Sequence, residues 1–128
     1  MTAPVLPASD LLELSHRGLR EASATTAPAE RYSLAHLAAL RAAAAMLACR
    51  TAPLTQRSRP TSAWVLLAQV APELSEWAAF FAAGARKRAA AEAGMRGAVT
   101  PREADDLLRD AESFLSVIET TLMGRMTG

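Results

Sequence analysis

The sequence predicts an all-α fold, an antiparallel four-helix bundle in which the third helix is kinked or split near Pro72. Proline, glycine, serine and threonine divide the chain into four long segments. Within each segment apolar residues recur at steps of three and four, the spacing of a helix, and none shows the alternation of a strand. The connections between the segments are short, which favours successive helices running in opposite directions.

Length and composition favour a single domain. The chain has 128 residues, of which 51% are hydrophobic, enough for one core and too few for two. We expect the domain to span residues 10–122, with flexible termini at 1–9 and 123–128. The formal net charge is only +1, so any binding to nucleic acid or to anionic lipid needs a local patch of charge.

The sequence favours a cytoplasmic protein without a membrane span. The longest weakly polar run, 34–48, is rich in alanine and is interrupted by His36 and Arg41. The first ten residues lack the basic start and the apolar segment of a signal peptide. Cys49 is the single cysteine, which excludes an internal disulfide, and we expect it to be buried as a small apolar side chain.

The first two helices are predicted over about 10–24 and 28–50. Asp10 and Glu13 have the spacing of a capping box at the start of the first helix. The segment TTAPAE then ends that helix, and Pro28 suits the first turn of the second.

The second helix is apolar nearly all round. One side carries a stripe at helical spacing, made of Leu34, Leu37, Leu40, Ala44 and Leu47. The opposite side is mostly alanine, and a helix of this kind is usually buried from more than one direction. We therefore expect it to be the central helix of the bundle or to pack against a second subunit.

A basic loop, 51–60, precedes the third helical region at about 62–94. Pro72 interrupts the backbone hydrogen bonds of this region, and Gly94 is a suitable C-cap. The part after Pro72 is expected to bury Leu74 together with three aromatic residues, Trp77, Phe80 and Phe81.

The last helix begins at the segment TPRE. Thr100 is the predicted N-cap, Pro101 takes the first helical position and Glu103 completes a capping box. One face of this helix is apolar. The other is charged, with Asp105, Asp106, Arg109, Asp110 and Glu112. This pattern is typical of a solvated face, so we predict no metal site and no cofactor.

Arg31 and His36 are the candidate catalytic pair. Residues five apart on an α-helix differ by about 140° in direction and about 7.5 Å in height, so the two side chains do not touch within one helix. A cleft between two subunits would suit them. There a histidine could transfer protons, and an arginine could hold a phosphate or stabilise developing negative charge.

The alternative interpretation of this pair is structural. Arg31 would then be a solvated residue of the first turn, and His36 would lie on the rim of the core. His36 comes four residues after Tyr32 and four before Leu40, at the edge of the leucine stripe, which fits a packing role.

Arg86, Lys87 and Arg88 are candidate residues for binding RNA or phosphate. Consecutive helical residues point about 100° apart, so the three cannot all face one ligand. No aromatic residue is interleaved among them to stack on bases. A solvated helix end, with cations near the negative end of the helix dipole, explains the same residues.

Three stretches of the chain resemble the HEPN superfamily of small helical domains. The segments AERYSLAHLAALRAAAAMLA and VTPREADDLLRDAESFLSVIE are similar to the family's alanine-rich second helix and its closing helix. The segment between them, SAWVLLAQVAPELSEWAAFFAAGARKRAAAEAG, is similar to a stand-alone actinobacterial branch. The resemblance covers residues 10–122.

The resemblance implies a homodimer and, for many members, a metal-independent ribonuclease. The family's active site is an arginine followed four to six residues later by a histidine, a spacing that Arg31 and His36 match. Two features depart from the family. Tyr32 stands where a polar residue often follows the arginine, and the motif usually lies in a later helix. Many members lack the motif and act as binding or regulatory modules.

Two functions follow from the sequence. We favour a non-catalytic, homodimeric interaction or regulatory module with a protein or RNA partner and no contact with a membrane. The alternative is a metal-independent endoribonuclease of toxin or defence type, with Arg31 and His36 acting across a dimer cleft.

Overall fold

The computed structural model describes residues 6–50 and 62–127, and the described residues form helices joined by short connections and contain no strand. The elements are α1 (Ala8–Ala24), α2 (Pro28–Arg50), α3 (Ala63–Val70), the short 3₁₀-helix η1 (Pro72–Leu74), α4 (Ser75–Ala83), α5 (Ala85–Glu92) and α6 (Pro101–Thr127). The all-α prediction is confirmed. The basic loop at 51–60 and residues 1–5 and 128 of the predicted termini lie outside the described residues, whereas α1 and α6 extend past the predicted boundaries at 10 and 122.

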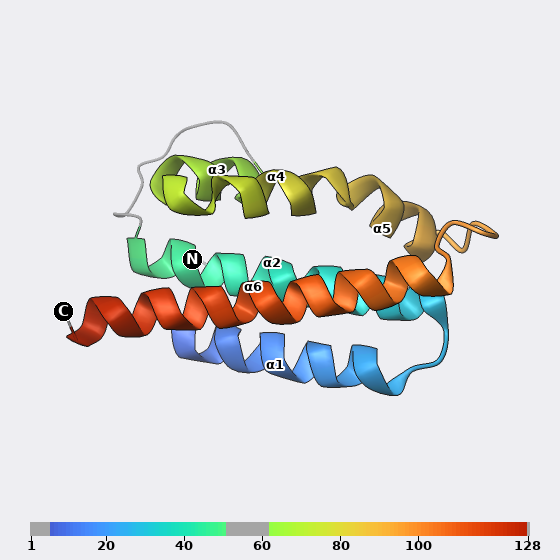
Figure 1. The fold of residues 1–128 in the computed structure, drawn as a ribbon, viewed down its shortest axis with the longest axis horizontal. Coiled ribbons are helices and arrows are strands. Elements are labelled where there is room, and N and C mark those ends of the chain that lie inside the picture. Colours follow the sequence, from blue (N-terminus) through green and yellow to red (C-terminus); the bar gives the residue numbers. More distant parts are fainter. Residues whose placement is uncertain (1–5, 51–61, 128) are drawn as a thin grey trace, which may run out of the picture.

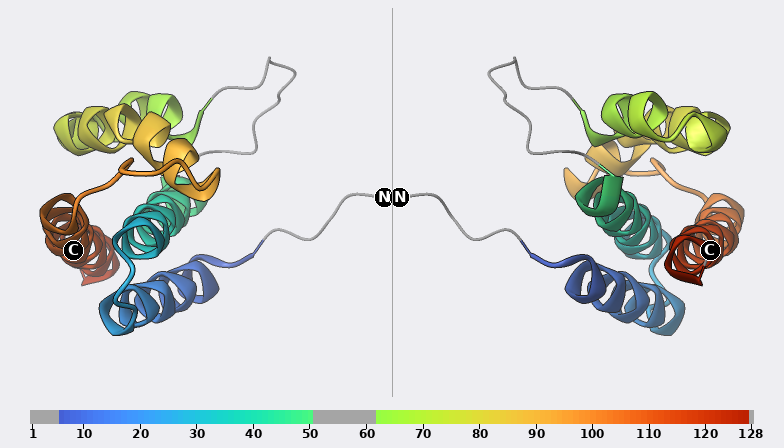
Figure 2. Two further views of the ribbon diagram at one scale, coloured as in Figure 1. Left: turned by 90° about the vertical axis from the view of Figure 1, so that its right-hand side faces the viewer. Right: turned by 90° about the vertical axis from the view of Figure 1, so that its left-hand side faces the viewer.

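The helices form three layers (Figure 1). α2 and α6 lie side by side in the middle layer, with α1 on one side and the α3–α5 region on the other. The end-on views show the same arrangement (Figure 2). Because α2 packs against α1, α6 and the α3–α5 region, it is the central helix, as its apolar character predicted.

Small residues allow α1 and α2 to approach closely. On α1, Ser15 is fully buried and its hydroxyl donates a hydrogen bond of 2.7 Å to the carbonyl oxygen of Ala38 on α2. A Cβ added to Gly18 would lie 3.4 Å from the Cβ of Ala38. The buried side of α2 is therefore its alanine side, and the five residues of the leucine stripe are only half-buried. The stripe is consequently the less buried side of the central helix, and Leu34, Leu40 and Leu47 of the stripe pack against the edge of the core.

The third helical region is broken twice. The first break is at Ala71 and Pro72, where the sequence predicted it. The second is at Gly84, where α4 ends and α5 begins, and the sequence did not predict it. The region ends near Gly94, whose φ of 75° is the left-handed conformation expected of a C-cap glycine.

The predicted caps differ between the first and the last helix. At α6 the capping box is confirmed, because the Thr100 hydroxyl accepts from the Glu103 N–H at 3.1 Å and the Glu103 carboxylate accepts from the Thr100 N–H at 2.9 Å. At α1 the predicted box of Asp10 and Glu13 is wrong. α1 begins two residues earlier, with Pro7 as an N-cap that makes no side-chain hydrogen bond.

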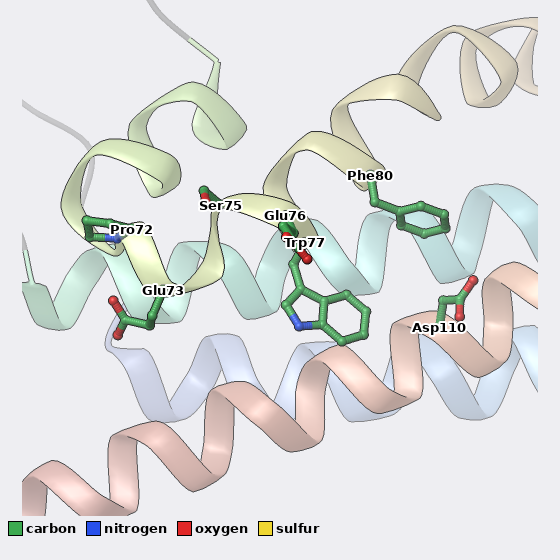
Figure 3. Close-up of a pocket in the computed structure, with 7 residues that line it drawn as sticks. All are labelled: Pro72, Glu73, Ser75, Glu76, Trp77, Phe80 and Asp110. Carbon is green, nitrogen blue, oxygen red and sulfur yellow. The ribbon is translucent and has the colours of Figure 1, made fainter.

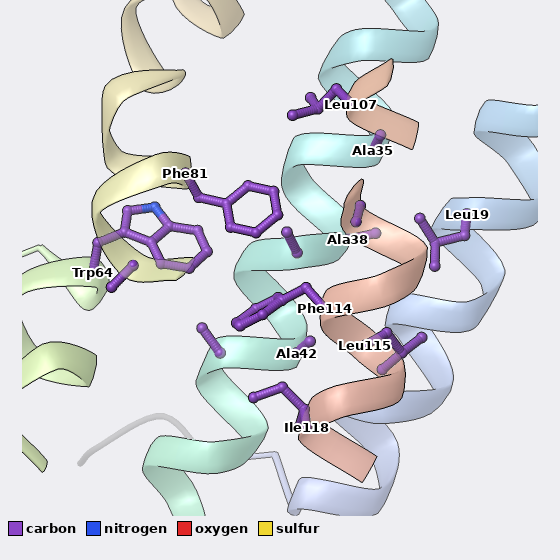
Figure 4. Packing of buried hydrophobic residues seen from close by; sticks show 14 of the residues in the cluster. Leu19, Ala35, Ala38, Ala42, Trp64, Phe81, Leu107, Phe114, Leu115 and Ile118 are labelled. Carbon is purple, nitrogen blue, oxygen red and sulfur yellow. The ribbon is translucent and has the colours of Figure 1, made fainter. Parts of the chain in front are cut away.

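Aromatic rings fill the space between the α3–α5 region and the middle layer (Figure 4). The ring of Phe81 lies 5.3 Å from that of Trp64 and 5.1 Å from that of Phe114, measured between centroids. Two predictions of burial are wrong. Phe80 is 46% exposed although its ring lies 5.0 Å from that of Phe81, and Cys49 is exposed near the end of α2.

α2 is the only described helix that is long and apolar enough to cross a membrane by length and composition. Half of its most apolar stretch is buried inside the bundle. The core helix of a packed domain has the same properties.

Candidate functional site

Arg31 holds the end of α1. Its Nε donates to the carbonyl oxygen of Ala22 at 2.9 Å, and its Nη2 donates to that of Thr25 at 2.5 Å. The last carbonyls of a helix have no partner within the helix and attract cations. Because the connection between α1 and α2 is short, the first turn of α2 brings Arg31 to those carbonyls.

The same guanidinium also reaches α6. Its Nη1 donates to a carboxylate oxygen of Asp105 at 2.5 Å, and the Arg31 side chain is 23% exposed. Arg31 therefore ties together the end of α1, the start of α2 and the start of α6. A phosphate that approached it would have to displace hydrogen bonds to a charged group, which are each worth about 1.5–3 kcal/mol.

His36 lies in the core rather than on its rim, with 1% of its surface exposed. Its Nε2 is 2.8 Å from the carbonyl oxygen of Phe81 on α4. A carbonyl only accepts, so Nε2 carries a proton, and in the neutral ring Nδ1 then carries none. Nδ1 is buried and has no hydrogen-bond partner among the described residues. The rings of Tyr32, Trp64 and Phe81 surround the imidazole, with centroids 6.0–6.4 Å away.

Burial lowers the pKa of His36 below its ordinary value of 6.5. The nearby positive charge of Arg88 lowers it further, while the hydrogen bond to Phe81 and the charge of Glu92 raise it. The histidine is therefore neutral at pH 7. In this position its unprotonated Nδ1 has a lone pair but no access to solvent.

The structure does not bring Arg31 and His36 together within one chain. Arg31 makes its hydrogen bonds to α1 and α6, and His36 makes its hydrogen bond to α4 on another side of α2. This divergence follows from their separation of five residues on one helix.

Tyr32, the residue after Arg31, lies with His36 against the break between α4 and α5 at Gly84. The Tyr32 hydroxyl is 3.5 Å from the carbonyl oxygen of Gly84, and His36 binds the carbonyl of Phe81 three residues earlier. A Cβ at Gly84 would lie 2.7 Å from the Tyr32 hydroxyl, so the close approach requires glycine. Burial raises the pKa of Tyr32, with a smaller contribution from Glu103. This cluster was not predicted from the sequence, although a glycine inside a helical pattern is the signal that could have indicated it.

Arg86, Lys87 and Arg88 point in different directions, as their consecutive positions require. Lys87 donates to Glu103 at 3.1 Å and to the carbonyl oxygen of Ala98 at 3.4 Å. Arg88 lies 3.6 Å from Glu92, one turn further along α5. Arg86 is exposed. Two of the three charges are thus compensated by carboxylates of the same chain.

Within residues 6–50 and 62–127, no three histidine, cysteine, aspartate or glutamate side chains are grouped as metal ligands would be. His16 is exposed on α1, and its Nε2 pairs with Glu119 of α6 at 2.7 Å.

The chain matches a family model described as SAV_6107-like HEPN over residues 22–119, which is most of its length. The chain therefore belongs to the HEPN family, as the resemblance of its helices indicated. No curated protein and no solved structure matches it.

Proposed function

Because the chain is a HEPN protein, we propose that it is a non-catalytic interaction or regulatory module that works as a homodimer. The observation that supports this proposal most strongly is the position of His36. A general acid or base must reach the proton that it transfers, directly or through one water. His36 uses its only N–H on a backbone carbonyl, and its other ring nitrogen is buried.

The hydrogen bonds of Arg31 support the same proposal. An arginine that stabilises a transition state needs donors aimed at the reacting group. In this chain the Nε, Nη1 and Nη2 donors of Arg31 point at three backbone carbonyls and one carboxylate of the same domain. Both Arg31 and His36 therefore make hydrogen bonds within the fold that explain their presence without catalysis.

The alternative function is a metal-independent endoribonuclease. The spacing of Arg31 and His36 favours it, because this is the spacing that the HEPN resemblance associates with catalysis. This function would require His36 to leave the core and a second subunit to complete the cleft.

The leucine stripe of α2 supports the homodimer. Leu37, Leu40 and Leu47 are partly exposed on the less buried side of the central helix, although Leu40 and Leu47 also touch the edge of the core. A two-fold axis would place this stripe against its own copy, because a symmetric dimer uses the same surface twice. We also propose that the protein resides in the cytoplasm.

An RNA cleavage assay tests the choice between the two functions. Purified protein is incubated with mixed RNA in EDTA, beside His36→Ala and the matched control His16→Ala, which alters the exposed histidine of α1. Circular dichroism shows which variants are folded. The module predicts no cleavage by any folded protein. Cleavage by the wild type and by His16→Ala that is absent in folded His36→Ala would establish the nuclease instead.

Sedimentation equilibrium tests the homodimer. Leu37→Glu combined with Leu40→Glu should convert a dimer to a monomer, because the stripe would then carry four charges across the two-fold axis. Met95→Glu is the matched control, since Met95 is an apolar residue that is 61% exposed outside α2. A wild type that is monomeric at all concentrations would refute the dimer.

A further inference from the structure

A hollow of about 530 Å³ lies between α4 and α6, on the side of α4 that faces solvent (Figure 3). Two aromatic side chains of α4, Trp77 and Phe80, form one part of its wall. Three carboxylates, Glu73, Glu76 and Asp110, form another.

The aromatic wall is held in place by the core. The Trp77 ring lies 5.4 Å from the Phe114 ring and 6.1 Å from the Phe81 ring, so its inner side is packed while the residue as a whole is only half-buried. Phe80 is 46% exposed although its ring rests on Phe81 at 5.0 Å. Two rings are thus presented to solvent in fixed positions, at little cost in conformational entropy on binding.

The charge of the hollow is negative and only partly compensated. Glu73 pairs with Arg50 at 2.7 Å. The ion pairs of the described residues include neither Glu76 nor Asp110. Burial and the charge of Asp106 raise the pKa of Asp110, and Arg109 offsets this only in part. A cation in the hollow would relieve this unfavourable environment.

We propose that the hollow between α4 and α6 binds an arginine side chain from a basic segment of a partner protein. A guanidinium is planar, so it stacks on an aromatic ring while its N–H groups bond to carboxylates. Trp77 and Phe80 provide the rings, and Glu76 of α4 and Asp110 of α6 provide the acceptors.

The charge distribution indicates a basic protein segment as the occupant. The whole chain has a net charge of +1, so it does not attract cations in general, and the attraction is local to the hollow. The carboxylates would repel the phosphates of RNA. This assignment rests on the proposed function, which it deepens by giving the module a class of partner and a site for it.

Fluorescence anisotropy tests the site directly. The probe is a fluorescein-labelled peptide with three arginines separated by Gly-Ser, and its lysine and citrulline counterparts are measured beside it. We expect saturable binding in the order arginine, lysine, citrulline, with citrulline weaker than arginine by at least about fivefold, the size of a cation–π contact at a partly exposed site. Equal binding of the arginine and citrulline peptides would overturn the proposal.

Matched variants locate the binding. Glu76→Gln with Asp110→Asn should weaken binding of the arginine peptide by about tenfold, and Phe80→Ala by about threefold. Glu112→Gln is the control, because it removes a charge from an exposed position of the same helix, α6. A loss as large in Glu112→Gln as in the double variant would show non-specific attraction. A change of oligomeric state in the double variant would assign the hollow to a second copy of the chain. Either result would refute the proposal.

The RNA cleavage assay separates failure of this inference from failure of the proposed function. Cleavage together with peptide binding would refute the non-catalytic module and leave the arginine site intact. Absence of both would refute the arginine site alone.

Discussion

The two sides of the central helix α2 are packed in different ways. Toward α1, small residues let two continuous helices approach until a serine hydroxyl reaches a backbone carbonyl. Toward the α3–α5 region, large aromatic rings fill the space under a helix that is broken at Pro72 and Gly84. A broken helix leaves backbone carbonyls to be satisfied, and Tyr32 and His36 approach two of them. The difference explains why polar residues are buried on α2, and it predicts a different response to mutation on each side.

The largest effect is expected from Phe81→Ala, on the aromatic side. Phe81 is fully buried between Trp64 and Phe114, so its truncation should lower the free energy of unfolding by about 3–5 kcal/mol. Urea denaturation measures this change. The neighbouring Phe80→Ala is the control and should cost less than about 1.5 kcal/mol, because Phe80 is half exposed. Equal losses would contradict the described packing.

Arg31→Ala should cause the next largest loss of stability, because Arg31 holds the end of α1. It removes the donors that satisfy the carbonyls of Ala22 and Thr25 and the charge that pairs with Asp105, so a loss of about 2 kcal/mol is expected. Arg31→Lys should recover little, since an ammonium cannot match the guanidinium geometry. Arg17→Ala, at an exposed position of α1, should change stability by less than about 0.5 kcal/mol. If Arg31→Ala unfolds at the same urea concentration as the wild type, the stabilising role of Arg31 at the end of α1 is refuted.

Gly84→Ala tests the break in the helix. The new Cβ would lie 2.7 Å from the Tyr32 hydroxyl, so we expect destabilisation of about 1–2 kcal/mol. Tyr32→Phe removes the hydroxyl and should cancel most of this effect when the two changes are combined. A thermal-denaturation double-mutant cycle measures the coupling. Purely additive changes in stability would mean that the Tyr32 hydroxyl does not clash with a side chain at position 84.

Gly18→Ala should have the smallest effect and the opposite sign. The added Cβ would meet the Cβ of Ala38 at 3.4 Å, close to an ordinary contact, while alanine favours the helix by up to about 1 kcal/mol over glycine. We expect a stabilisation of about 0.5 kcal/mol by urea denaturation. A loss greater than about 1 kcal/mol would show that α1 and α2 have no room for a methyl group.

Much of the fold could be predicted because its signals are local. The capping box of Thr100 and Glu103, the interruption at Pro72 and the C-cap at Gly94 are each determined by neighbouring residues. The central position of α2 followed from its uniformly apolar character. The false capping box at Asp10 has the same local pattern, but Pro7 starts the helix earlier.

The rest depends on contacts between distant segments. Nothing near Arg31 in the sequence indicates that it will meet the end of α1 and Asp105. The exposure of Phe80 and the break at Gly84 depend on how α4 is oriented relative to α2 and α6. Helical periodicity in the sequence does not indicate that orientation. The hollow beside Phe80 was unpredicted for the same reason.

The stability of the protein should depend on pH through His36. Its pKa is lowered in the folded state, so the unfolded state binds this proton more readily. The stabilisation from the neutral ring is therefore complete above pH about 6.5 and is lost as the pH falls below that value. His36→Asn, which removes the titration, should make the stability curve flatter over this range.

The most direct test of the structural role of His36 is a ¹⁵N NMR titration of its imidazole, with and without RNA. We expect a neutral ring with the proton on Nε2 at pH 7, an apparent pKa below 6.5, and no change on addition of RNA. A ring that is protonated above pH 6.5, or whose Nδ1 signal shifts when RNA is added, would show that His36 reaches a substrate and would contradict the non-catalytic module.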